Sequence, residues 1–184
     1  MRIWRPGGLW LQASVVTLGA FDGVHRGHQA LVGAAVRRAR ELGVPAVAWT
    51  FDPPPRAHFG GARILTPLGE KLARLSALGL DHLVVVPFDA AYARRDARAF
   101  LRELATVAPL EVWVGPDFRF GRGRAGSVAT LARCWPVRQM EPIRCPRGER
   151  ISSSRIRRLL EAGREAEARE LLGWPAPGGC RRVA

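Results

Sequence analysis

Lysine and cysteine are scarce in this sequence, and each scarcity excludes a class of protein or site. Lys71 is the only lysine, so the 29 basic residues are otherwise arginines. The three cysteines, Cys134, Cys145 and Cys180, lie far apart and form no C-x-x-C pair. This spacing excludes a disulfide framework and a structural zinc site. No uncharged apolar run reaches the length of a membrane helix. We therefore expect a cytoplasmic protein without a membrane partner.

Acidic residues are also few. The chain has 16 Asp and Glu against 29 Lys and Arg, which gives a formal net charge of +13. Such a surface attracts polyanions such as nucleic acid, nucleotide phosphates or acidic lipid. A general preference for arginine explains the same composition. No recognised RNA-binding module accompanies the charge, so nucleic acid is not an expected partner.

The residues that are present fit one folded domain. The chain has 184 residues, of which 47% are hydrophobic and 24% charged, enough for a single core. The apolar stretch from Gly8 to Phe21 resembles a signal peptide, but Gln12 interrupts it and we interpret it as containing a buried first strand. Strands are expected at residues 13–18, 44–51, 82–88, 111–114 and 137–143, and helices at 29–42, 66–79, 94–105, 152–162 and 165–172. This alternation predicts an α/β fold, a parallel sheet with helices on both faces and a ligand crevice at the carboxyl ends of the strands.

A glycine-rich loop follows the first expected strand. Gly19, Gly23 and Gly27 lie in it, and His25 and His28 stand at its end. Glycines let backbone amides approach a phosphate, and a helix start adds partial positive charge. At a helix start this histidine spacing can direct both imidazoles at one anion. The alternative is a strand-to-helix turn whose histidines only cap or pack. The loop matches neither a P-loop nor the dinucleotide-binding G-x-G-x-x-G pattern.

Two later segments have the chemistry of ligand contacts. Three serines, Ser152 to Ser154, open an expected helix, and Arg157 follows one turn later. Hydroxyls and free amides at a helix start bind phosphate oxygens, although an ordinary serine N-cap gives the same pattern. Phe118 and Phe120 alternate with Arg119. These rings can stack on a flat ring system or face the core.

Four motifs together resemble the adenylyltransferase module of bacterial FAD synthetases. Residues 19–28 read GAFDGVHRGH and contain the H-x-G-H signature of nucleotidyltransferases. Residues 114–121 (VGPDFRFG), 151–157 (ISSSRIR) and 51–55 (FDPPP) are similar to three further motifs of that module. The resemblance spans about Val15 to Leu172. It implies a Rossmann-like nucleotidyltransferase fold for residues 1–173, with 174–184 as a C-terminal tail.

The resemblance also implies a reaction and a set of site residues. ATP and FMN would be the substrates, FAD and pyrophosphate the products, and Mg²⁺ the cofactor bridging the phosphates. The implied catalytic residues are His25, His28 and Arg157. The implied ATP-binding residues are Gly19, Phe21, Asp22, Gly27, Ser152, Ser153 and Ser154. The implied flavin-binding residues are Pro53, Pro55, Asp117 and Phe118. Asp22 would be an indirect metal ligand, unless it only caps the following helix.

Two departures from the family pattern keep alternatives open. Pro54 stands where the module usually has histidine, and no riboflavin kinase domain follows residue 173. We therefore expect no kinase activity, and the identity of the acceptor is open. The alternatives are a nucleotidyltransferase that uses another phosphorylated acceptor or CTP, a nucleotide- or flavin-binding protein without turnover, and a nucleic-acid-binding protein.

Overall fold

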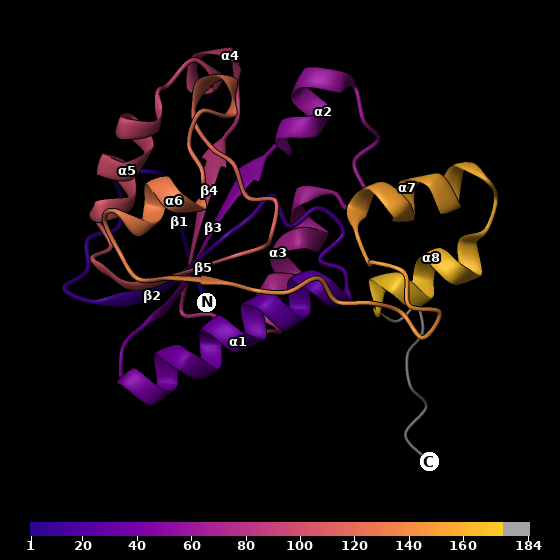
Figure 1. Ribbon diagram of the computed structural model, residues 1–184, viewed down its shortest axis with the longest axis horizontal. Coiled ribbons are helices and arrows are strands. Elements are labelled where there is room, and N and C mark those ends of the chain that lie inside the picture. The colour runs from indigo at the N-terminus through magenta and orange to yellow at the C-terminus, as the bar shows by residue number, and fades with distance from the viewer. Residues whose placement is uncertain (175–184) are drawn as a thin grey trace.

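The computed structural model describes residues 1–174 as a six-stranded sheet with helices packed around it (Figure 1). The strand order is β1-β4-β3-β2-β5-β6, and every pairing between neighbours is parallel. The strands are β1 (Arg2–Trp4), β2 (Ser14–Leu18), β3 (Ala46–Asp52), β4 (His82–Pro87), β5 (Pro109–Val114) and β6 (Val137–Gln139). The predicted parallel α/β fold is confirmed. Most of the predicted tail, and Cys180 within it, lie outside the described residues.

Eight α-helices and a 3-10 turn accompany the sheet in the described part of the chain. They are α1 (Arg26–Leu42), α2 (Pro55–Gly60), α3 (Leu68–Ser76), α4 (Ala90–Ala93), α5 (Ala97–Ala105), η1 (Arg122–Arg124), α6 (Val128–Ala132), α7 (Ser153–Glu161) and α8 (Glu165–Leu172). The five predicted helices correspond to α1, α3, α5, α7 and α8. None of the helices described is long and apolar enough to cross a membrane.

Alternating side chains of the central strands feed two separate cores. Val15 packs with α1 and α3 on one face of the sheet, whereas Val16 packs with α5 and α6 on the other. Ala48 and Trp49 on β3 divide in the same way. Each central strand is therefore buried on both faces, which explains its continuous apolar sequence. The prediction of helices on both faces is confirmed.

The N-terminal edge of the sheet differs from the prediction. Residues 2–4 form the edge strand β1, which pairs with β4, so the expected first strand is the second. Three residues, one of them Arg2, give no alternation from which a strand could be predicted. The expected strand at 137–143 ends at Gln139, and residues 140–143 leave the sheet as a loop.

The sheet order creates a crevice at the carboxyl ends of two central strands. From β2 the chain adds β3 and then β4 on one side, and then crosses over to add β5 and β6 on the other. The loops that follow β2 and β5 therefore diverge at the carboxyl ends of two neighbouring strands. Open α/β sheets bind ligands at such a switch point.

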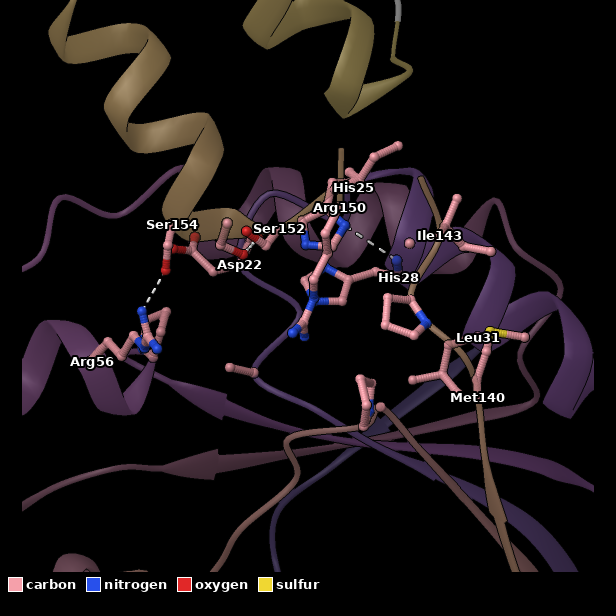
Figure 2. Close-up of a pocket in the computed structure, with 18 of the residues that line it drawn as sticks. Asp22, His25, His28, Leu31, Arg56, Met140, Ile143, Arg150, Ser152 and Ser154 are labelled. Carbon is pink, nitrogen blue, oxygen red and sulfur yellow. Dashed lines mark hydrogen bonds between the residues drawn. The ribbon is translucent and has the colours of Figure 1, made fainter. Parts of the chain in front are cut away.

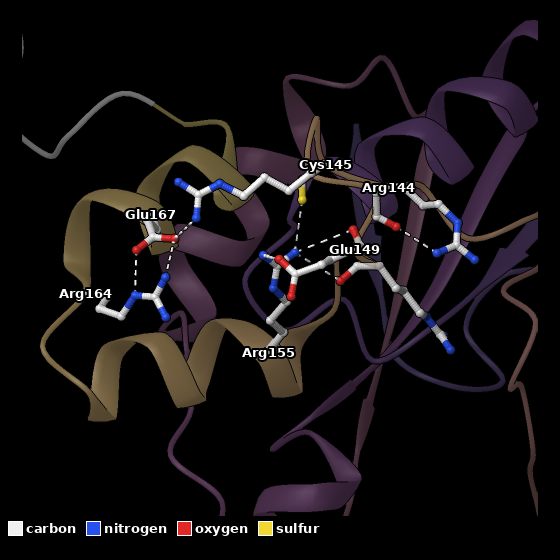
Figure 3. Close-up of polar contacts among 9 residues, drawn as sticks. Arg144, Cys145, Glu149, Arg155, Arg164 and Glu167 are labelled. Atoms are coloured by element: carbon white, nitrogen blue, oxygen red, sulfur yellow. Dashed lines mark hydrogen bonds and ion pairs between the residues drawn. The ribbon is translucent and has the colours of Figure 1, made fainter.

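A hairpin at residues 144–150 connects the sheet to the helical pair α7 and α8. The Cys145 amide donates to the Glu149 carbonyl at 2.9 Å. Arg155 Nη1 donates to Cys145 Sγ at 3.3 Å, and Arg155 also pairs with Glu149 (Figure 3). Arg147 on the hairpin lies 3.4 Å from Glu167 on α8. These contacts fix the segment that carries Arg150 and Ile151 into the crevice.

Candidate active site

A cavity of about 300 Å³ occupies the switch point between β2 and β5 (Figure 2). Five segments distant in sequence form its wall: the loop after β2 with the start of α1, the start of α2, the loop after β5, the loop after β6, and residues 150–157 at the start of α7. The lining residues are Ala20, Asp22, His25, Gly27, His28, Leu31, Pro54, Pro55, Arg56, Gly115, Pro116, Met140, Glu141, Pro142, Ile143, Arg150, Ile151, Ser152, Ser153, Ser154 and Arg157. The two motifs with phosphate-binding chemistry, residues 19–28 and 151–157, therefore meet in one place.

His25 and His28 form a stacked pair at the start of α1. His25 is the N-cap of the helix, and its Nδ1 accepts the His28 backbone N–H at 3.3 Å. The two rings stack with centroids 3.7 Å apart. An added Cβ at Gly27 would come within 3.2 Å of the His25 ring, so glycine leaves room for that ring. Because Nδ1 is an acceptor, the proton of neutral His25 is on Nε2, where it is available as a donor.

Burial keeps both imidazoles neutral. Burial, with a smaller contribution from the positive charge of Arg150 and against a backbone hydrogen bond that raises it, lowers the pKa of His25 from 6.5 to about 4. Burial, with His25 and Lys71 nearby, lowers the pKa of His28 well below its ordinary value. The pair can thus donate hydrogen bonds to an anion as neutral imidazoles. A bound polyphosphate would favour their protonation.

We expect this neutral pair to make the fold sensitive to mild acid. The unfolded chain protonates His25 near pH 6.5 and the folded chain only near pH 4, so stability falls as pH decreases between these values. The gap corresponds to about 3 kcal/mol, all of it lost below pH 4, with no effect above pH 6.5. Urea unfolding from pH 7.5 to pH 4 should show a shallower loss in His25→Gln than in the native chain. Equal slopes for the two proteins would contradict this.

Asp22 and Arg157 form a buried ion pair beneath the pocket. Their side chains are 3% and 9% exposed. Asp22 Oδ1 also accepts the backbone N–H groups of Leu65 at 2.9 Å and Thr66 at 3.3 Å. Arg157 Nε donates to the Arg63 carbonyl at 2.6 Å. Most of the hydrogen-bonding capacity of both side chains is therefore used within the protein, which joins the loop after β2 to the start of α7.

The three serines at the start of α7 all face the pocket. Ser152 is the N-cap, and its Oγ accepts the Arg155 amide at 3.3 Å, which leaves its O–H available to donate. Ser153 Oγ donates to the Asp22 carbonyl at 2.9 Å. Ser154 Oγ accepts a hydrogen bond from Arg56 (Figure 2). Ser152 is therefore an ordinary N-cap, and the three serines also line the pocket, so the two interpretations of the motif are compatible.

Five residues of the predicted site lie outside the pocket lining: Gly19, Phe21, Pro53, Asp117 and Phe118. The Phe21 side chain is fully buried and packs edge-to-face on His28, with centroids 5.3 Å apart. A Cβ at Gly19 would lie 2.8 Å from the Phe21 ring, so Gly19 makes space for that ring. These two residues support His28 from below. Their predicted contact with ATP has no counterpart in the pocket lining.

The predicted flavin-binding residues divide into two groups. Pro55 lines the pocket at the start of α2, next to the buried Pro54. Asp117 is exposed and pairs with Arg150. Phe118 is half-buried and stacks on Phe120 at 5.8 Å between centroids. Phe120 is in the core, as the alternative interpretation of this pair expected.

Several pocket residues were not predicted. The loop Met140 to Ile143 was assigned to a strand, so its place in the wall was missed. Arg56 and Arg150 flank the predicted motifs. Arg56 follows Pro55 directly, and Arg150 lies two residues before Ser152. Their positive charge is the only signal in the sequence, and it does not distinguish them among so many arginines.

The pocket does not contain a ready-made metal site. No group of three or more His, Cys, Asp or Glu side chains that could hold a metal ion occurs among residues 1–174. Both oxygens of Asp22 are bound by protein groups. The pocket residues therefore do not fit a dedicated Mg²⁺ site, and Asp22 as the indirect ligand is not supported by its contacts.

Structural comparison finds the same fold in solved proteins. The chain superposes on the crystal structure of a macrolide-efflux protein from Streptococcus pneumoniae with a TM-score of 0.81 and 25% identity, covering 95% of this chain and 61% of that one. It also matches the pantoate-beta-alanine (pantothenate synthetase) structure from Thermus thermophilus with a TM-score of 0.54 and 18% identity, over 94% and 81% of the two chains. The second match concerns the fold alone.

Sequence comparison identifies the family. The family model described as FAD synthetase matches residues 10–155. A protein of Geobacillus thermodenitrificans (strain NG80-2), named "Putative bifunctional riboflavin kinase/FMN adenylyltransferase", is 56% identical over 168 residues, which cover 91% of this chain and 94% of that protein. The bifunctional riboflavin kinase/FMN adenylyltransferase of Escherichia coli (strain K12) is 36% identical over 175 residues, which cover 89% of this chain and 55% of the relative. This chain spans about half the length of that second relative. With its motifs gathered in one pocket and the family model matching most of its length, the chain belongs to the FAD synthetase family.

Proposed function

We propose that this chain is an FMN adenylyltransferase, which joins ATP and FMN to give FAD and pyrophosphate. The observation that carries the proposal is the His25–His28 pair, stacked at the start of α1 and facing the serines of α7 across one pocket. Both relatives described above are named for this activity. Residues 1–173 would form the nucleotidyltransferase domain, acting in the cytoplasm.

The reaction is an in-line displacement at the α-phosphorus of ATP. A phosphate oxygen of FMN forms the new bond, and the bond from the α-phosphorus to the bridging oxygen breaks. The departing electron pair leaves with pyrophosphate. Because the FMN phosphate is already an anion, no base has to remove a proton. The protein contributes position and stabilisation of the developing charge.

Each group in the pocket has a role in this scheme. The Nε2–H of His25 and the ring of His28 would donate to the α- and β-phosphate oxygens. The amides and hydroxyls at the start of α7 would hold the terminal phosphates. Arg157 would act indirectly, because its ion pair with Asp22 would hold the start of α7 in place. The pocket residues offer no dedicated Mg²⁺ site, and bound Mg²⁺ would supply charge neutralisation at the phosphates of ATP.

The proposal is tested by a product assay. The purified chain is incubated with ATP, Mg²⁺ and FMN, and the flavins are separated by chromatography, with riboflavin replacing FMN in a parallel reaction. We expect FAD from FMN, and neither FMN nor FAD from riboflavin. A folded, ATP-binding protein that forms no FAD would contradict the proposal.

A second candidate reaction uses another phosphorylated acceptor, or CTP in place of ATP. Pro54 favours it, because a buried proline lines the pocket where the family usually has histidine. Proline has neither a side-chain donor nor a backbone N–H to orient a ring. A panel of phosphorylated acceptors, each tested with ATP and CTP, separates the two candidates: the true pair gives the highest kcat/KM.

A further inference from the structure

The arginines around the pocket differ in how much of their charge is available to a ligand. Three guanidinium groups line it, those of Arg56, Arg150 and Arg157. A bound triphosphate needs cationic partners, and these arginines carry a full positive charge whether or not a ligand is bound. Which arginine serves it depends on the existing partner of each.

Two of the three arginines already pair with a carboxylate. Arg157 is buried against Asp22, and its Nε is bound to the Arg63 carbonyl. Arg150 pairs with Asp117, which lies outside the pocket lining. Moving either guanidinium onto a ligand would first break an ion pair, and for Arg157 it would leave Asp22 buried and charged.

Arg56 is different. Among the described residues, no carboxylate lies within ion-pairing distance of it, and its guanidinium contact is the hydrogen bond from Nη1 to Ser154 Oγ. It is exposed in the first turn of α2, immediately after Pro54 and Pro55. Figure 2 shows it reaching from α2 towards the start of α7. A guanidinium has five N–H donors in a planar fork, so most of its donors remain for a ligand.

The start of α7 gives this charge a definite target. Ser154 lies in the first turn of α7, where the first backbone N–H groups have no partner within the helix. A guanidinium held against that turn adds a full positive charge to the partial charge of the helix. The combination suits a doubly charged phosphate group rather than a neutral adenine or flavin ring.

We infer that Arg56 binds the β- and γ-phosphates of ATP, and afterwards pyrophosphate, in one anion site with the first turn of α7. The inference rests on the proposed function for the place of ATP in the pocket. The tri-proline segment before Arg56 carries this cation on a stiff support, beside the position where the family usually has histidine. Arg56 is thus assigned a binding role in the loop that departs from the family pattern.

The test is equilibrium binding of ATP, pyrophosphate and AMP to the full chain, measured by calorimetry without FMN. In Arg56→Ala we expect affinity for ATP and pyrophosphate to fall about tenfold or more, and affinity for AMP, which lacks these phosphates, to stay unchanged. Arg56→Lys should recover part of the loss, because lysine keeps the charge but not the fork. Arg102→Ala, which removes a charge on α5 outside the pocket, is the matched control and should bind all three ligands normally.

A double-variant cycle separates a direct contact from an effect through Ser154. If Arg56 acts only by holding that hydroxyl, Arg56→Ala costs nothing further in a Ser154→Ala background. We expect a further loss of pyrophosphate affinity there. Unchanged pyrophosphate binding in Arg56→Ala, or an equal loss for AMP, would overturn the inference. The binding measurements contain no FMN, so they do not depend on the identity of the acceptor. A failed FAD assay would therefore refute FMN as the acceptor without changing the result for Arg56.

Discussion

Replacing Asp22 with alanine is expected to lower the free energy of unfolding by about 3–5 kcal/mol, because it strands the buried Arg157 charge. The loss has three parts that act together. The guanidinium loses its carboxylate, and the backbone N–H groups of Leu65 and Thr66 lose their acceptor. Urea denaturation at pH 7 measures the change. A loss of this size also loosens the pocket, since Asp22 joins the loop after β2 to α7.

The chain provides a matched control for this prediction. Asp117 and Arg150 also form an aspartate–arginine pair, but their side chains are 68% and 43% exposed. Solvent screens such a pair, so Asp117→Ala should change stability by no more than about 1 kcal/mol. Similar losses from the two substitutions would show that burial does not decide the contribution of these pairs.

A double substitution separates the charge from the packing. Asp22→Leu combined with Arg157→Met removes both charges and keeps apolar volume, so it should be more stable than Asp22→Ala alone. It should nevertheless remain catalytically poor, because the hydrogen bonds to residues 63, 65 and 66 are gone. A double variant as unstable as the single one would place the cost in those backbone contacts instead of in the unpaired charge.

The central strands were predictable because burial on both faces dictates their composition. Val84 to Val86 in β4 and Val112 in β5 can be continuous and apolar only where both faces are covered. The edge strand β1 was not predictable, since Arg2 and Ile3 are exposed and its backbone pairing with β4 gives no side-chain pattern. The short helices α2 and α4 could not be predicted for a similar reason, because neither has a buried residue that would give a helical period in the sequence.

The candidate site was predictable where a motif dictates the local geometry. It was not predictable where contacts between distant segments determine the position of a side chain. His25 at an N-cap and Ser152 at another follow from the residues themselves. The partners of Arg157 do not, because its carboxylate comes from a loop 135 residues earlier in the chain. The same holds for Phe21, whose place under His28 depends on a backbone φ of 46° that the sequence does not reveal.

Replacing His28 with alanine is expected to lower kcat at least tenfold without loss of stability. The ring stacks on His25 and presents a neutral imidazole to the pocket, so the variant removes a donor where negative charge develops. Loss of one such donor in other enzymes costs about 10²–10³ in turnover. The stability argument is separate. His28 Nδ1 is buried without a hydrogen-bond partner among the described residues, and alanine favours the first turn of α1.

The two halves of this prediction can be measured on the same samples. FAD formation gives kcat and KM, and urea unfolding shows whether the fold is intact. His28→Gln should recover part of the rate, because its amide can donate where alanine cannot. His82→Gln changes a histidine at the opposite end of the sheet, where Trp4 Nε1 donates to it at 3.1 Å, and should leave kcat unchanged. An unchanged rate in His28→Ala would remove His28 from the mechanism and leave His25 and the start of α7 as the groups that stabilise the departing pyrophosphate.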